Sequence, residues 1–102
     1  MIVRQVATKV REWAEEWNDR NNHPFPESLQ GMCVICAAKL LHELHKAKVN
    51  ATGYLNSSHG FVIVDDHIVD VTASQFGFPD IFIEHHALHR DSIYWKIESA
   101  VK

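Results

Sequence analysis

Apolar residues recur with helical spacing in two stretches of the first half of the chain. Over residues 3–18 they return every three or four positions, and charged residues, Arg11 among them, fill the positions between. The apolar members of this stretch are Val3, Val6, Val10, Trp13 and Trp17. Residues 32–47 repeat the spacing with a stripe of Cys33, Cys36, Ala37, Leu40, Leu41 and Leu44. Each stretch predicts an amphipathic helix, and the second is expected to start between Ser28 and Met32.

The second half of the chain changes to short β-branched runs. Val49–Leu55 predicts a strand, and Gly60–Val64 with Ile68–Thr72 predicts a hairpin that turns on Asp65-Asp66. Further strand candidates are Ile81–Ile83 and Ser92–Ile97. Two helices followed by a small antiparallel sheet predict an α+β fold.

Length and composition narrow the class of protein. A chain of 102 residues fits a single domain, residues 1–102, and 46% hydrophobic residues can build a core. The net charge of −3 leaves no broad basic surface, which argues against a nucleic-acid partner. No apolar stretch has the length of a signal peptide or a membrane span, so no membrane partner is expected. The two cysteines lie three residues apart and favour reduced thiols, hence a cytoplasmic protein.

The hairpin register brings two chemically active side chains together. If the turn is Asp65-Asp66, Val64 pairs with His67, and His59 and Asp70 become diagonal neighbours on one face, roughly 7–8 Å apart by backbone. Val62, Val64, Val69 and Val71 then fall on the opposite face, where they can bury against a helix. An imidazole beside a carboxylate is suited to proton transfer.

Cys33 is the matching candidate nucleophile. It stands where the second helix should begin, and free backbone N–H groups and the helix dipole favour a thiolate there. Cys33 would attack a carbonyl carbon, His59 would carry the proton, and Asp70 would orient His59 and stabilise its charged form.

These segments resemble a known superfamily. Gly31–Leu44 (GMCVICAAKLLHEL), His59-Gly60-Phe61-Val62 and Asp70–Phe76 (DVTASQF) look like bacterial and phage transglutaminase-like or papain-like cysteine proteins. The resemblance covers about residues 29–77. It implies a papain/transglutaminase-like core and a triad of Cys33, His59 and Asp70. It also implies hydrolysis, deamidation or acyl transfer at an amide or peptide bond of a protein or peptide substrate.

Other residues compete for roles at this site. Gln30 precedes Cys36 by six positions, and the same spacing separates an oxyanion-donating glutamine from the nucleophile in the papain pattern. That alignment would make Cys36 the nucleophile and Gln30 the donor. Gln75 is a further candidate for a polar role. We prefer Cys33 because it is nearer the expected helix start, whereas Cys36 is followed by Ala37-Ala38 as in a packed turn.

Eight histidines suggest one more possibility. His42 and His45 lie three apart on the second helix, and His85, His86 and His89 cluster near the end of the chain. Such spacings can bind zinc or copper, but solvated histidines without a ligand role are the simpler interpretation, so no metal and no cofactor are expected. The sequence thus leaves three hypotheses: a cysteine-nucleophile enzyme, a non-catalytic protein-binding module of the same fold, and a histidine-based metal-binding protein.

Overall fold

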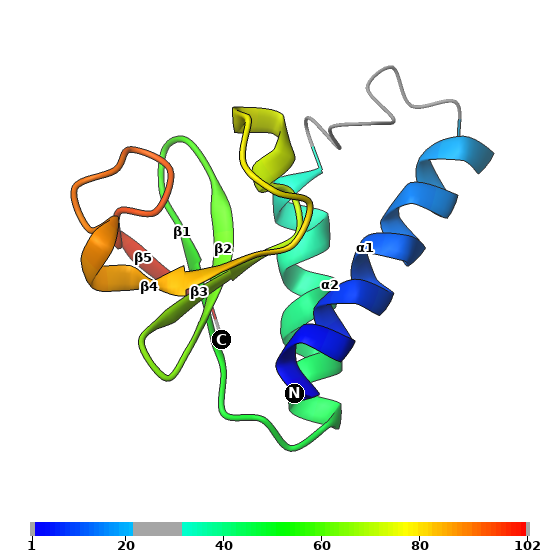
Figure 1. The fold of residues 1–102 in the computed structure, drawn as a ribbon, viewed down its shortest axis with the longest axis horizontal. Helices are drawn as coiled ribbons and strands as arrows, with labels where there is room; N and C mark the ends of the chain where they lie inside the picture. The colour runs from blue at the N-terminus through cyan, green and yellow to red at the C-terminus, as the bar shows by residue number, and fades with distance from the viewer. Residues whose placement is uncertain (1, 22–31, 102) are drawn as a thin grey trace.

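The computed structural model describes residues 2–21 and 32–101, and its architecture is α+β, as predicted. Helices α1 (Ile2–Arg20) and α2 (Cys33–Lys46) precede the sheet in the chain. The strands are β1 (Thr52–Leu55), β2 (Gly60–Val64), β3 (His67–Asp70), β4 (Phe82–His85) and β5 (Ser99–Val101), and two short 3₁₀ helices, η1 (Ala73–Phe76) and η2 (His86–Leu88), flank β4. Figure 1 shows α2 lying between the sheet and α1, so the molecule has three layers.

Helix α1 packs on α2 through small and branched side chains. Ala7, Val10 and Ala14 are buried, and Trp13 and Trp17 are partly buried against the same core. These residues follow the three- and four-residue spacing that predicted the helix, which the structure extends by a few residues at its ends.

Arg11 departs from the polar pattern of α1. The sequence places it among the charged residues between the apolar positions, yet only 4% of the residue is exposed. Its Nη1 donates to the carbonyl of Val71 (2.9 Å) and to the hydroxyl of Ser74 (2.8 Å), and its Nε pairs with Glu15 (3.1 Å). A guanidinium can be buried when acceptors surround it, and here the acceptors come from a segment distant in sequence. Arg11 therefore ties α1 to the chain that follows β3.

The described strands form one antiparallel sheet in the order β4-β3-β2-β1-β5. The predicted hairpin register is confirmed, because Val62 pairs with Val69 and Val64 pairs with His67. Asp65 and Asp66 have φ values of 47° and 63°. Positive φ at both central residues is typical of a type I′ turn, whose twist matches that of the strands it joins.

Replacing Asp66 by glycine is expected to raise the free energy of unfolding by about 0.5–1 kcal/mol, because glycine adopts positive φ without a steric penalty. Urea denaturation measures the change. Asp91→Gly is the control, since Asp91 is exposed and its φ is not positive, and it should leave stability unchanged or lower it. A destabilised Asp66→Gly protein would contradict the turn assignment.

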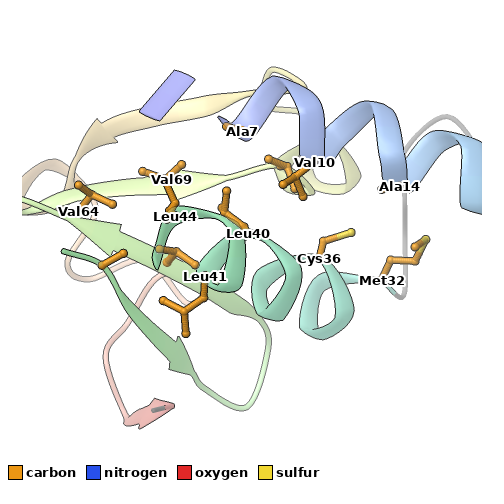
Figure 2. Packing of buried hydrophobic residues seen from close by; sticks show 13 residues of the cluster. Ala7, Val10, Ala14, Met32, Cys36, Leu40, Leu41, Leu44, Val64 and Val69 are labelled. Carbon is orange, nitrogen blue, oxygen red and sulfur yellow. The ribbon is translucent and has the colours of Figure 1, made fainter. Parts of the chain in front are cut away.

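The sheet separates two apolar clusters. On the face toward the helices, the β2–β3 valines pack against both helices, and Figure 2 shows Val64 and Val69 opposite Leu40 and Leu44 of α2. This cluster contains all four valines predicted for that face: Val62, Val64, Val69 and Val71. The other cluster consists of Phe61, Ile68, Ala73, Phe82 and Trp95. Alternation along β2 and β3 therefore sends one set of side chains to the helices and the other to an aromatic cluster.

Two predicted strands need correction. The predicted strand Val49–Leu55 begins only at Thr52. The end of α2 continues into a turn, in which Lys48 has a φ of 63° and the Val49 N–H donates to the Leu44 carbonyl. Ser92–Ile97 is not a strand. The Trp95 N–H bonds the Ser92 carbonyl in a turn, and the carbonyls of Tyr94 and Lys96 accept from the Asn56 side chain. These groups are therefore not available to a sheet ladder.

Strand β5 was not predicted from the sequence. Residues 99–101 pair with β1, matching Leu55 with Ser99 and Gly53 with Val101. The strand is too short to show an alternating pattern. Within the described part of the chain, no helix is long and apolar enough to cross a membrane.

Candidate active site

The start of α2 and the start of β2 meet at one point. A Cβ atom built on Gly60 would lie 3.5 Å from the Cα of Val34, 3.6 Å from the carbonyl oxygen of Cys33 and 2.9 Å from Leu55 Cδ2. Such an atom would meet the backbone of α2 at ordinary van der Waals distance and would displace only the end of the Leu55 side chain, so the helix and the strand lie close together here. Because His59 precedes Gly60 and Cys33 precedes Val34, the contact brings a thiol and an imidazole to the same place.

His59 and Asp70 form a buried pair. His59 Nε2 lies 2.5 Å from Asp70 Oδ2, and both side chains are almost completely excluded from solvent. The predicted diagonal placement on one face of the hairpin accounts for this contact. An ionised carboxylate only accepts hydrogen bonds, so Nε2 carries a proton and Nδ1 is the remaining reactive nitrogen.

Three residues fix the Asp70 carboxylate. Its Oδ1 accepts from the backbone N–H (2.8 Å) and the hydroxyl (3.1 Å) of Thr72. Its Oδ2 accepts from Trp95 Nε1 (2.9 Å) as well as from His59. Four hydrogen-bond donors offset the cost of removing the carboxylate from water, and they hold it in one orientation.

Trp95 was not identified as a site residue from the sequence. It is completely buried and stacks on Phe82, with ring centroids 4.5 Å apart. A tryptophan within a predicted strand is expected to pack in the hydrophobic core. Nothing in the local sequence indicates that its N–H lies beside an aspartate 25 residues earlier. The signal that could have suggested the pairing is chemical, because a buried indole N–H needs an acceptor.

The electrostatics of Cys33 and His59 are coupled. The neighbouring His59 imidazole, helped by the backbone at Gly60 and Val34, holds the pKa of Cys33 below its usual 9.0 despite partial burial. Burial works to lower the pKa of His59, but its hydrogen bond to Asp70 and the neighbouring Cys33 thiol raise that pKa to about 9. His59 Nδ1, the ring nitrogen that Asp70 does not contact, is buried and has no hydrogen-bond partner among residues 2–21 and 32–101. Each group therefore favours the charged form of the other, and the thiolate of Cys33 is more populated than that of an ordinary cysteine.

Aromatic rings and one asparagine hold His59 in place. Phe76 meets the imidazole edge-on at 5.1 Å between centroids and stacks on Tyr94 at 3.9 Å. Asn56 Oδ1 accepts from the backbone N–H of His59 (2.8 Å), while its Nδ2 donates to the carbonyls of Tyr94 and Lys96. Asn56 therefore links the turn before β2 to the segment that carries Trp95.

The competing site residues differ in position. Cys36 is fully buried in the core, where Figure 2 shows it on the side of α2 that faces α1, and burial raises its pKa to about 12. Gln75 is half-buried in η1, and its Nε2 has no hydrogen-bond partner in the described ranges. Gln30 lies outside the described residues. Of the two thiols, Cys33 is the one that is partly exposed and interacts with the His59 imidazole.

A shallow apolar groove lies near the start of α2. It has a free volume of about 300 Å³ including its open mouth, and it runs between α2 and β1. Its walls are Val34, Ala37, Ala38 and Leu41 of α2, Gly53, Tyr54 and Leu55 of β1, and Phe61 of β2. Val34 directly follows Cys33 in the chain. The Leu55 side chain lies next to Gly60, where the start of β2 approaches α2. The groove can hold an apolar group, and its walls begin at the residue after the candidate nucleophile, which is not itself part of them.

The other histidines do not converge on a metal site in the described residues, where no group of three potential ligands is found. His86 Nε2 contacts the Trp95 carbonyl (2.9 Å), His89 Nε2 contacts Glu84 (2.8 Å), and His45 Nε2 contacts the Ala51 carbonyl (2.8 Å). Each of these three imidazoles therefore has a hydrogen-bond partner within the protein.

Fold and side chains together define an α+β protein in which a thiol at a helix start adjoins a buried imidazole–carboxylate pair. Comparisons of the chain with models of protein families, with curated proteins and with solved structures give no match. The functional assignment therefore depends on the geometry of this site.

Proposed function

We propose that the protein is a cysteine-nucleophile enzyme that acts on amide or peptide bonds through a covalent acyl-enzyme. The observation that carries the proposal is the placement of the Cys33 thiol, at the start of α2, beside the buried His59–Asp70 pair. Each member has the environment its role requires: the thiol is partly exposed, the imidazole is oriented, and the carboxylate is fully hydrogen-bonded.

The first half of the reaction forms a thioester. The Cys33 thiolate attacks the carbonyl carbon of the substrate, and the carbonyl electron pair moves onto its oxygen. When the carbonyl re-forms, the carbon–nitrogen bond breaks and the amine leaves with the proton of His59 Nδ1. Asp70 stays ionised and holds the imidazole by Nε2 throughout.

The second half releases the acyl group. Neutral His59 takes a proton from water or from an amine, which attacks the thioester carbon, and the Cys33 thiolate leaves. Water gives hydrolysis or deamidation, and an amine gives acyl transfer. The first N–H groups of α2 have no acceptor within the helix, since the first intrahelical bond runs from Cys36 N–H to Met32 C=O. They are therefore the candidate donors to the oxyanion.

Two further observations support the enzyme over the non-catalytic module. The apolar groove starts at Val34 and gives a protein or peptide substrate a surface beside the thiol. Cys33 lies on a helix, and His59 and Asp70 follow it in the chain beside paired strands. This order agrees with the resemblance to papain-like and transglutaminase-like proteins and supports a core of that type.

The test is the rate at which iodoacetamide alkylates Cys33 as a function of pH, followed by mass spectrometry of peptides. Because the pKa of Cys33 is lowered, the rate is expected to rise and level off below pH 9.0, the usual thiol value. His59 keeps its proton up to a pH of about 9, so substrate turnover should rise with the thiolate and fall again near that pH.

Cys33→Ala is the matched control, because Cys36 remains as the second thiol. It should remove the fast-reacting thiol and leave a protein that alkylates only on unfolding. A wild-type Cys33 that reacts as slowly as Cys36 would refute the proposed enzyme. A reactive Cys33 in a protein without turnover of any peptide or glutamine-amide substrate would favour the non-catalytic module.

A further inference from the structure

The two thiols of the protein lie at neighbouring positions of one helical turn. Cys33 is the first residue of α2 and Cys36 is three residues further on. Positions i and i+3 of a helix bring their Cα atoms to about 5 Å, within the range that a disulfide spans. Both residues also line one small cavity, together with Gly60 and Asp70.

The surroundings of the two thiols differ in the way that sequential oxidation requires. Cys33 is partly exposed and interacts with His59, so it is the thiol that a reagent from solvent meets first. Cys36 is completely buried, and its pKa is raised, so it is protected from direct oxidation. Figure 2 shows it one turn into α2, with Met32 at the helix start as its neighbour. In Cys-x-x-Cys pairs at helix starts, an outer thiolate reacts and an inner thiol resolves the product.

We propose that Cys33 and Cys36 form a reversible redox pair, in which hydrogen peroxide oxidises Cys33 and Cys36 closes an intrahelical disulfide that switches the nucleophile off. The Cys33 sulfur attacks one peroxide oxygen, the oxygen–oxygen bond breaks, and the departing hydroxide takes a proton to become water. The Cys36 sulfur then attacks the sulfenic sulfur of Cys33. The sulfur–sulfur bond forms, the sulfur–oxygen bond breaks, and the hydroxyl leaves as water with the Cys36 proton.

Reduction reverses the step, with two electrons supplied by an external dithiol. The pair protects the site, because a sulfenic acid without a resolving thiol is oxidised further to forms that thiols do not reduce. The inference uses the same Cys33 thiolate as the proposed function, but it requires no acyl chemistry.

The experiment treats the full chain with hydrogen peroxide and follows it by peptide mass mapping. The wild type is expected to lose both thiols, to yield one peptide carrying an internal disulfide, and to recover its full rate of iodoacetamide alkylation after dithiothreitol. Cys36→Ala is the matched variant, because it leaves Cys33, His59 and Asp70 unchanged. It should form a dimedone-trappable sulfenic acid at Cys33, and its alkylation rate after peroxide and dithiothreitol should be about tenfold or more below the wild-type value.

The outcomes separate the two proposals. If Cys33 is alkylated rapidly but peroxide leaves the Cys36 thiol free, or links two chains, the redox pair is wrong and the proposed enzyme stands. If Cys33 reacts with neither iodoacetamide nor peroxide, both fail. The disulfide in the wild-type peptide is read directly, so the test does not depend on the Cys36→Ala protein being stable.

Discussion

Asp70→Asn is expected to slow the alkylation of Cys33 at neutral pH, by about tenfold for each unit by which the thiol pKa rises, because the thiolate population falls with it. The carboxylate is what keeps the proton on His59, since burial alone would lower the pKa of that imidazole. Without Asp70 the imidazole becomes neutral, and the Cys33 pKa moves back toward its usual 9.0. The pH–rate profile should therefore shift to higher pH.

The measurement compares pH–rate profiles for wild type, Asp70→Asn and Asp91→Asn. Asp91 is exposed, so its variant makes the same change of net charge without touching His59. Circular dichroism and urea denaturation establish that each variant is folded at the pH of the assay. An unshifted profile in folded Asp70→Asn protein would mean that the carboxylate does not control the thiol.

Arg11→Met is expected to lower the free energy of unfolding by about 2–3 kcal/mol, because it leaves a buried carbonyl without its donor and removes a bond to a hydroxyl. The methionine keeps most of the apolar stem, so the loss reports the guanidinium and its contacts with Val71 and Ser74. These contacts hold the segment directly after Asp70, so a lower rate of Cys33 alkylation should accompany the loss of stability.

Urea denaturation measures the change, and Arg4→Met is the control, because Arg4 is an exposed position of the same helix. That variant should stay within about 0.5 kcal/mol of the wild type. Equal stability of the two variants would show that the Arg11 bonds add nothing to the fold.

Local pattern was sufficient for the hairpin and for half of the site. Strand alternation and a two-residue turn fix which side chains share a face, so the placement of His59 beside Asp70 could be predicted from their positions around Asp65-Asp66. Helical spacing gave both helices, and with them the position of Cys33 at the start of α2.

The remaining site residues depend on contacts distant in sequence. Trp95 reaches Asp70 from a turn that was predicted as a strand, and Asn56 reaches the carbonyls of Tyr94 and Lys96. Arg11 bonds a carbonyl 60 residues away. Periodicity indicates the local backbone conformation and the exposed side of a helix or strand. It does not indicate which distant polar group will form a hydrogen bond with a buried polar group.

The hairpin of β2 and β3 has a consequence for how this protein can vary over evolutionary time. The segment 59–72 places valines against the helices and, on alternate positions, His59 and Asp70 in the site. Inserting or deleting one residue in either strand would exchange the two faces, and both the core and the site would be lost together. Lineages of this protein should therefore tolerate substitutions in this segment while keeping its length fixed, and changes of length should accumulate elsewhere.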